Sequence, residues 1–147
     1  MGRVTVPASG LIYIDSCVLI YGIERVEPYF SCASALWPVE GARPQIITSA
    51  LTLLEVLVKP FREKNDSLGQ AYRESIMSPE GVQCIPITLP LLESAARIRA
   101  EFGLRTPDAI HTATAISSGC VLFVTNDVVF RRISGLNVAV ISEISSA

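Results

Sequence analysis

The chain has 147 residues and a formal net charge of −2 at pH 7, and 50% of its residues are hydrophobic while 18% are charged. This composition excludes intrinsic disorder and favours one soluble domain, residues 1–147, with enough apolar surface to associate with another chain. No apolar run approaches the roughly eighteen residues of a membrane span, and the four scattered cysteines, without a Cys-x-x-Cys pair, are typical of small core residues in the cytoplasm.

Short apolar runs alternate with helical patterns along the chain, which predicts parallel strands joined by helical crossovers. The predicted strands are 11–14, 45–48, 82–87, 121–125 and 138–141. The predicted helices are 16–23, 29–39, 50–60, 67–77, 91–102, 107–117 and 128–133. Because the strands are nearly wholly apolar, helices should cover both faces of the sheet. The sequence therefore predicts an α/β fold.

The predicted helix 107–117 has the clearest end signals. Thr106 followed by Pro107 is a typical helix start, with a hydroxyl to cap the helix and a proline at its first position. Gly103 and Gly119 stand where the flanking helices should end.

Four acids stand among apolar residues. Asp15 and Asp127 each follow a predicted strand, Glu55 interrupts an apolar helix, and Asp108 opens another helix. An unpaired charge in such surroundings is strongly penalised. Buried acids without a nearby Lys or Arg in sequence therefore indicate a bound cation, and hard divalent metals are the natural candidates.

The predicted topology brings these acids together. All strands of a parallel sheet point the same way, so Asp15 and Asp127 fall at its carboxyl edge, where open α/β sheets bind their ligands. The helix that carries Asp108 must return the chain to the opposite edge, so its first turn also lies at the carboxyl edge. Glu55 lies within the first two turns of a helix that begins there. We expect one acidic cleft.

The chemistry of such a cleft follows from its charge. Carboxylates a few Å apart cannot all stay ionised without a cation, so the cleft should bind Mg²⁺ or Mn²⁺. One metal can generate hydroxide from water, and a second can stabilise the leaving oxygen of an in-line displacement. The predicted reaction is hydrolysis of a phosphodiester.

Several polar residues are expected around the acids, where they would orient water, bond the carboxylates or meet phosphate. These candidates are Ser16, Arg105, Thr112, Thr125 and Asn126. Ser16, Thr125 and Asn126 are also ordinary turn and cap formers. His111 lies one turn after Asp108, but hard metals prefer oxygen, so we expect it to be a hydrogen-bonded neighbour of the cleft and not a ligand.

Four motifs along the chain resemble those of a known family. They are Asp15-Ser16, Leu54-Glu55-Val56, Arg105-Thr106-Pro107-Asp108-Ala109-Ile110-His111 and Thr125-Asn126-Asp127. In order and spacing they are similar to the acidic motifs of PIN-domain nucleases. Within that family they most resemble the motifs of the VapC-type toxins of prokaryotic toxin–antitoxin pairs. The third motif is the most specific.

The resemblance implies a three-layer α/β/α sandwich with a central, mainly parallel sheet. It also implies a metal-dependent endoribonuclease that uses Asp15, Glu55, Asp108 and Asp127 as catalytic metal ligands. The implied partners are an RNA substrate, a cognate antitoxin protein and a second copy of the chain.

Another interpretation stays open. Asp15, Asp108 and Asp127 each stand where a carboxylate can cap a helix, and Glu55 can pair with Thr52. A net charge of −2 is also poor for a nucleic-acid binder, although bound metal would offset the acidic cleft. The alternative is a catalytically silent PIN-like module that binds a partner protein.

Overall fold

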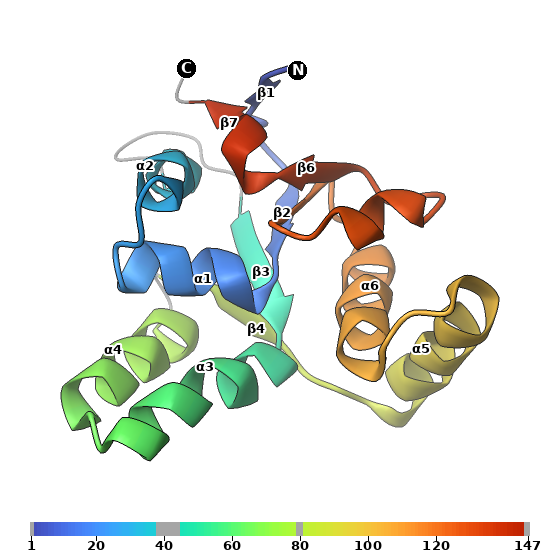
Figure 1. The fold of residues 1–147 in the computed structure, drawn as a ribbon. Coiled ribbons are helices and arrows are strands. Elements are labelled where there is room, and N and C mark those ends of the chain that lie inside the picture. Colours follow the sequence, from blue (N-terminus) through green and yellow to red (C-terminus); the bar gives the residue numbers. More distant parts are fainter. Residues whose placement is uncertain (1, 38–44, 79–80, 146–147) are drawn as a thin grey trace.

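The computed structural model describes residues 2–37, 45–78 and 81–145 and contains a central sheet of five strands (Figure 1). The strand order is β4-β3-β2-β5-β6, and every neighbouring pair is parallel. The strands are β2 (Leu11–Ile14), β3 (Gln45–Ser49), β4 (Gln83–Ile85), β5 (Leu122–Thr125) and β6 (Val138–Val140). The predicted parallel sheet is confirmed.

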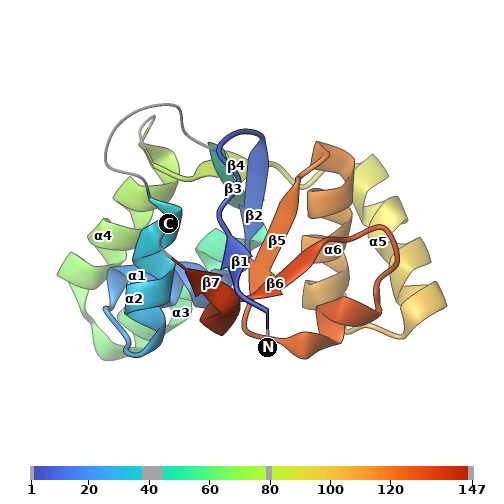
Figure 2. The ribbon, with the colours of Figure 1, turned by 90° about the horizontal axis from the view of Figure 1, so that it is seen from above.

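Helices cover both faces of this sheet (Figures 1 and 2). One layer holds α1 (Ser16–Ile23), α2 (Tyr29–Ala33), α3 (Leu51–Glu63) and α4 (Asp66–Met77). The other holds α5 (Leu89–Phe102) and α6 (Thr106–Ser118). Three short 3-10 helices connect elements: η1 (Ser34–Leu36), η2 (Val128–Arg132) and η3 (Ile141–Glu143). The fold is the predicted three-layer α/β/α sandwich.

Alternation along β2 decides which layer each side chain meets, since successive strand residues point to opposite faces. Ile12 and Ile14 pack in the core under α1, α3 and α4. Tyr13 points the other way, into a cluster with Phe123 of β5 and Ala115 of α6. The hydroxyl of Tyr13 is thereby brought to α6.

Both ends of the described chain meet in a second, small sheet. The strands β1 (Val4–Thr5) and β7 (Ile144–Ser145) pair in parallel, which places the N- and C-terminal segments side by side (Figure 1). Neither strand is predicted from the sequence, because two residues are too few to show an alternating pattern.

The strand predicted at 82–87 is too long. Only Gln83–Ile85 pairs with β3. The Val82 N–H instead donates to the Ser75 carbonyl, and Pro86 has no N–H for the ladder.

Helix ends differ from the prediction in several places: α5 begins at Leu89, two residues before the predicted start, and the predicted helix 128–133 is the 3-10 helix η2. The hydroxyl of Thr106 makes no cap: α6 begins at Thr106 itself, after Arg105, and has no side-chain cap. α3 continues beyond Pro60 to Glu63, because a proline in the last turn removes only one backbone bond. The helix predicted at 29–39 ends as an α-helix at Ala33 and continues as η1, while its residues 38–39 lie outside the described ranges.

The predicted glycine stops are confirmed. Gly103 ends α5 with φ 68°, and Gly119 ends α6 with φ 69°. These left-handed conformations favour glycine, which has no Cβ to clash with the following carbonyl. Within the described ranges, no helix combines the length and the apolar character needed to cross a membrane.

Candidate active site

A pocket of about 450 Å³ at the carboxyl edge of the central sheet is lined by all four predicted acids. Asp15 follows β2, Asp127 lies two residues after β5, Glu55 comes from α3, and Asp108 comes from the first turn of α6. The remaining described lining residues are Ser16, Cys17, Tyr21, Arg105, His111, Asn126, Val128 and Phe130. Four segments distant in sequence therefore share one cleft.

Asp15 is the most firmly held of the acids. It is only 7% exposed, and its Oδ1 accepts hydrogen bonds from the Cys17 thiol at 2.7 Å and from the Val18 N–H at 3.4 Å. Its Oδ2 accepts the Thr125 hydroxyl at 2.5 Å. Burial raises the pKa of Asp15, and the hydrogen bonds from Cys17 and Thr125 oppose this rise only in part. Asp15 therefore both caps α1 and lines the pocket.

Asp108 is buried at the start of α6. Its Oδ2 accepts a hydrogen bond of 3.1 Å from Nε of Arg105, whose side chain is 78% exposed. The Thr112 hydroxyl, predicted to lie around the acids, donates instead to the backbone carbonyl of Asp108 at 2.8 Å. Thr112 therefore supports the helix turn under Asp108 and does not contact its carboxylate through this bond.

Asp127 lies on the exposed side of the pocket. Its Oδ1 caps η2 by accepting the Val129 N–H at 2.9 Å, and its own N–H donates to the Thr125 hydroxyl at 3.0 Å. The neighbouring Asn126 donates its side-chain amide to the Tyr21 hydroxyl at 2.9 Å. Thr125 thus links the two acids that follow β2 and β5.

Glu55 is tied to the protein by a histidine. Nε2 of His111 lies 2.7 Å from Oε1 of Glu55, and Nδ1 of His111 lies 2.5 Å from the Tyr13 hydroxyl. His111 has hydrogen-bond partners on both ring nitrogens, in line with the expectation for this residue. The pair of Glu55 with Thr52, considered as the structural alternative, does not form, and the Thr52 hydroxyl lies 2.6 Å from that of Thr48 instead.

Two residues that line the pocket and hydrogen-bond within it were not predicted from the sequence as functional neighbours. Cys17 contacts Asp15, and Tyr21 contacts Asn126. They are four residues apart on α1 and so lie on one helix face. Because α1 begins directly after Asp15, this helical spacing is the signal in the sequence that could have indicated both residues. Burial beside Asp15 raises the pKa of the Cys17 thiol, which makes this cysteine a hydrogen-bond donor and not a nucleophile.

The pocket suits a hard cation by its ligand chemistry. Its acids offer carboxylate oxygens, which Mg²⁺ and Mn²⁺ prefer. Among the described residues no three His, Cys, Asp or Glu side chains form a ready-made metal cage. Mg²⁺ is usually held by one or two carboxylates and several waters, so an open pocket with dispersed acids fits it.

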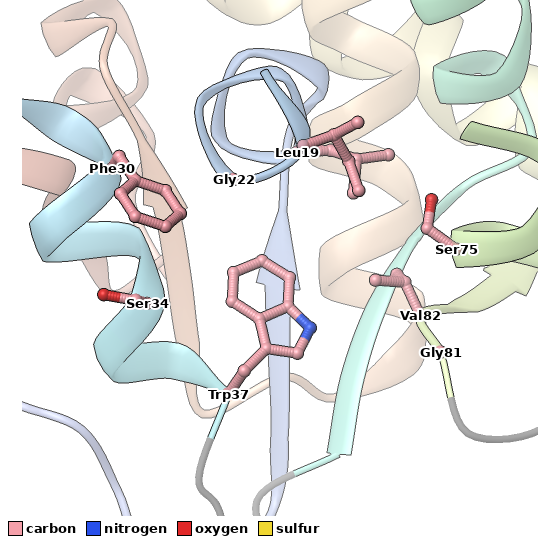
Figure 3. A pocket seen from close by; sticks show the side chains of 9 residues that line it. Leu19, Gly22, Phe30, Ser34, Trp37, Ser75, Gly81 and Val82 are labelled. Atoms are coloured by element: carbon pink, nitrogen blue, oxygen red, sulfur yellow. The ribbon is translucent and has the colours of Figure 1, made fainter. Parts of the chain in front are cut away.

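A second pocket of about 450 Å³ has a different character. Leu19 of α1, Phe30 of α2, Trp37 after η1 and Val82 before β4 line it, and Figure 3 shows these side chains around one apolar space. None of its described lining residues is ionisable. Acid–base and metal chemistry therefore belong to the acidic pocket.

The parallel sheet and the acids at its carboxyl edge define an α/β/α protein with an acidic pocket. The profile of the PIN domain matches residues 12–136, and the chain belongs to the PIN domain family. A search of curated proteins gave no match.

Solved structures share this fold. VapBC2 from Rickettsia felis, bound to a DNA fragment from its promoter, is 18% identical with a TM-score of 0.69, and the match covers 88% of this chain and 98% of that chain. A toxin–antitoxin complex from Klebsiella pneumoniae is 27% identical with a TM-score of 0.66, covering 87% and 95%. The sarcin-ricin loop cleaving toxin VapC20 of Mycobacterium tuberculosis is 20% identical with a TM-score of 0.63, covering 76% and 86%.

Proposed function

We propose that this PIN-domain protein is a Mg²⁺- or Mn²⁺-dependent endoribonuclease that hydrolyses RNA phosphodiester bonds as the toxin of a VapBC-type pair. The observation that carries the proposal is the gathering of Asp15, Glu55, Asp108 and Asp127 in one pocket. The structural likeness to toxins of such pairs supports it, as does membership of the PIN domain family.

The four carboxylates would hold the cation, one or two of them directly and the others through bound water. When bound, this metal supplies a Lewis acid at the phosphate and lowers the pKa of the attacking water. Thr125 and Cys17 fix the carboxylate of Asp15 by donating to its two oxygens. Asp15 would thus keep its orientation while substrate enters.

Arg105 would meet the substrate at the mouth of the pocket. Its guanidinium is mostly exposed and contacts Asp108 by one bond, so its other N–H groups can donate to a phosphate. A net charge of −2 gives little general attraction for RNA, which makes this local positive charge important for binding.

Cleavage of labelled RNA with and without chelator tests the proposal. The wild type should cut RNA with added Mg²⁺ or Mn²⁺, and chelator, Asp15→Asn or Asp108→Asn should abolish cutting. Asp66→Asn is the matched control, because Asp66 lies exposed in the first turn of α4, outside the pocket. If the wild type and both pocket variants behave alike, the protein is the silent binding module and not a nuclease.

A small antitoxin is the proposed protein partner. Structural neighbours include complexes of a toxin with its antitoxin. In the proposed pair, this chain would cut cellular RNA in the cytoplasm and the antitoxin would suppress the cleavage. A short reading frame for a DNA-binding protein beside this one would supply the candidate. Its product should co-purify with this chain and suppress RNA cleavage, and a product that does neither would refute the pairing.

We also propose that residues 1–147 act as one domain and form a homodimer through α3. Leu54, Val58 and Phe61 stand on one face of this helix and are 63%, 44% and 63% exposed. Such a stripe on a soluble protein typically marks an interface. Light scattering should give a dimer for the wild type and a monomer for Phe61→Glu, whereas a monomeric wild type would refute the proposal.

A further inference from the structure

Two side chains from two other elements join Glu55 to the centre of the protein. Tyr13 of β2 contacts His111 of α6, and His111 contacts Glu55 of α3, at 2.5 Å and 2.7 Å. The contacts span 98 and 56 residues of sequence. Tyr13 and His111 are almost fully buried, whereas the Glu55 side chain is 28% exposed at the pocket. The chain of contacts thus runs from the core to the pocket wall.

An ionised carboxylate only accepts hydrogen bonds, so the proton in the contact between Glu55 and His111 lies on Nε2, and this fixes the direction of the chain. The Ser49 backbone N–H can only donate, and it lies 3.1 Å from the Tyr13 hydroxyl oxygen. The Tyr13 hydroxyl proton is then free to point at Nδ1 of His111. With its single proton on Nε2, the imidazole ring donates to the Glu55 carboxylate. In this arrangement each donor of the chain meets an acceptor.

Ring packing keeps the donor of this chain in place. The Tyr13 ring stacks on Phe123 with centroids 5.0 Å apart and an interplanar angle of 9°. The His111 ring meets Tyr13 edge-on, at 5.8 Å and 73°. Neither ring can turn without disturbing the core between the sheet and α6.

Glu55 needs such support more than the other pocket acids. Asp15 and Asp127 are short side chains that cap their own α1 and η2, and Asp108 pairs with nearby Arg105. Glu55 has one more rotatable bond than an aspartate, so fixing its side chain costs more conformational entropy. The bond from His111 supplies a fixed donor for it.

We infer that Tyr13 and His111 are positioning residues that hold the Glu55 carboxylate in the pocket through the Nε2–H tautomer of His111. The inference rests on the proposed nuclease function for its consequence in catalysis. The tautomer and the metal affinity can be measured without any cleavage assay.

Nitrogen-15 NMR of the single histidine tests the chain of bonds in metal-free protein. At about pH 8, where an ordinary imidazole is neutral, the wild type should show a protonated Nε2 and an unprotonated Nδ1. Tyr13→Phe removes only the hydroxyl and should give a mixture of tautomers. Tyr72→Phe is the control, since it removes another buried hydroxyl that bonds a carboxylate, that of Glu24, outside the pocket.

Metal binding and kinetics test the consequence. Tyr13→Phe should weaken Mn²⁺ binding, measured by calorimetry, and lower kcat by about tenfold, as loss of a residue that orients a ligand typically does. KM for RNA should stay unchanged. In a Glu55→Gln background, Tyr13→Phe should lower kcat no further, because the two residues act through one contact. If Tyr13→Phe does not fold, His111→Gln takes its place in the calorimetry and kinetics.

Two results would overturn the inference. One is a wild-type ring with its proton on Nδ1 or divided between both nitrogens. The other is a drop in kcat from Tyr13→Phe that is as large in the Glu55→Gln background as in the wild-type background, which would show a general loss of structure. A wild type without nuclease activity would refute the proposed function alone, and the NMR and Mn²⁺ measurements would still decide the role of Tyr13 and His111.

Discussion

The Thr125 hydroxyl donates a hydrogen bond of 2.5 Å to Oδ2 of Asp15, across 110 residues of sequence. The oxygen of this hydroxyl also accepts the backbone N–H of Asp127 at 3.0 Å. One buried hydroxyl at the end of β5 therefore fixes both the acid after β2 and the loop that carries the acid after β5.

Replacing Thr125 by valine keeps the shape of the side chain and removes this hydroxyl. Asp15 then loses a buried donor and the Asp127 N–H loses its acceptor, so the free energy of unfolding should fall by about 1–3 kcal/mol. RNA cleavage should slow by about 10- to 100-fold, the usual effect of freeing a ligand. Urea unfolding and a cleavage assay measure the two effects.

Thr114→Val is the matched control for this change. Thr114 is also fully buried, but its hydroxyl bonds a backbone carbonyl of its own helix, that of Ile110. Equal losses of activity in the two variants would contradict a specific role for Thr125.

Asp15 should make the metal-free protein more stable as the pH falls. Burial raises the pKa of this carboxyl in the folded state, so between the ordinary aspartate pKa of about 3.9 and the raised value the folded protein binds more protons than the unfolded chain. The free energy of unfolding then decreases as the pH rises through this window. Asp15→Asn cannot titrate there.

Urea unfolding of both proteins in chelator, from neutral pH down to about pH 4, measures this effect. The wild type should gain stability relative to Asp15→Asn as the pH falls. A constant or opposite difference would show that burial does not control the ionisation of Asp15.

Glu24 should have the opposite pH dependence. Burial alone would raise its pKa, but hydrogen bonds from Lys59, at 2.5 Å, and from the Tyr72 hydroxyl together lower the pKa of Glu24. Its stabilising contribution is therefore present above the ordinary glutamate pKa of about 4.3 and is lost as the pH falls through the lower folded value.

Glu24→Gln should lower the free energy of unfolding by about 1 kcal/mol at neutral pH, with the difference from wild type shrinking in acid. Glu101→Gln, at an exposed position of α5, serves as the control and should change little. A difference that persists unchanged at low pH would mean that the charge of Glu24 is not what stabilises the fold.

Arg105 should matter for substrate binding and little for stability. Its bond to Asp108 involves a mostly exposed guanidinium, and such ion pairs contribute about 0–1 kcal/mol. Arg105→Ala should raise KM for RNA, more at low salt than at high salt, because the lost contact is to a phosphate. Arg97→Ala removes a comparable exposed pair, with Glu93 outside the pocket, and should leave KM unchanged.

The sequence by itself determined the sheet and the place of its acids. Apolar runs marked β2 and β5, and Asp15 follows β2 directly while Asp127 lies two residues after β5, so a parallel sheet had to put both at one edge. The glycine stops were equally local, since Gly103 and Gly119 take backbone conformations that favour glycine wherever they occur.

Only the tertiary structure decided which side chains support those acids. Tyr13 reaches His111, and Thr125 reaches Asp15, through contacts across 98 and 110 residues that depend on which face of the sheet each side chain takes. A hydrogen bond between distant segments leaves no periodic pattern in either segment, unlike the burial of a strand or the end of a helix. The pairing of β1 with β7 was also not predictable, because strands of two residues are too short to show an alternating pattern.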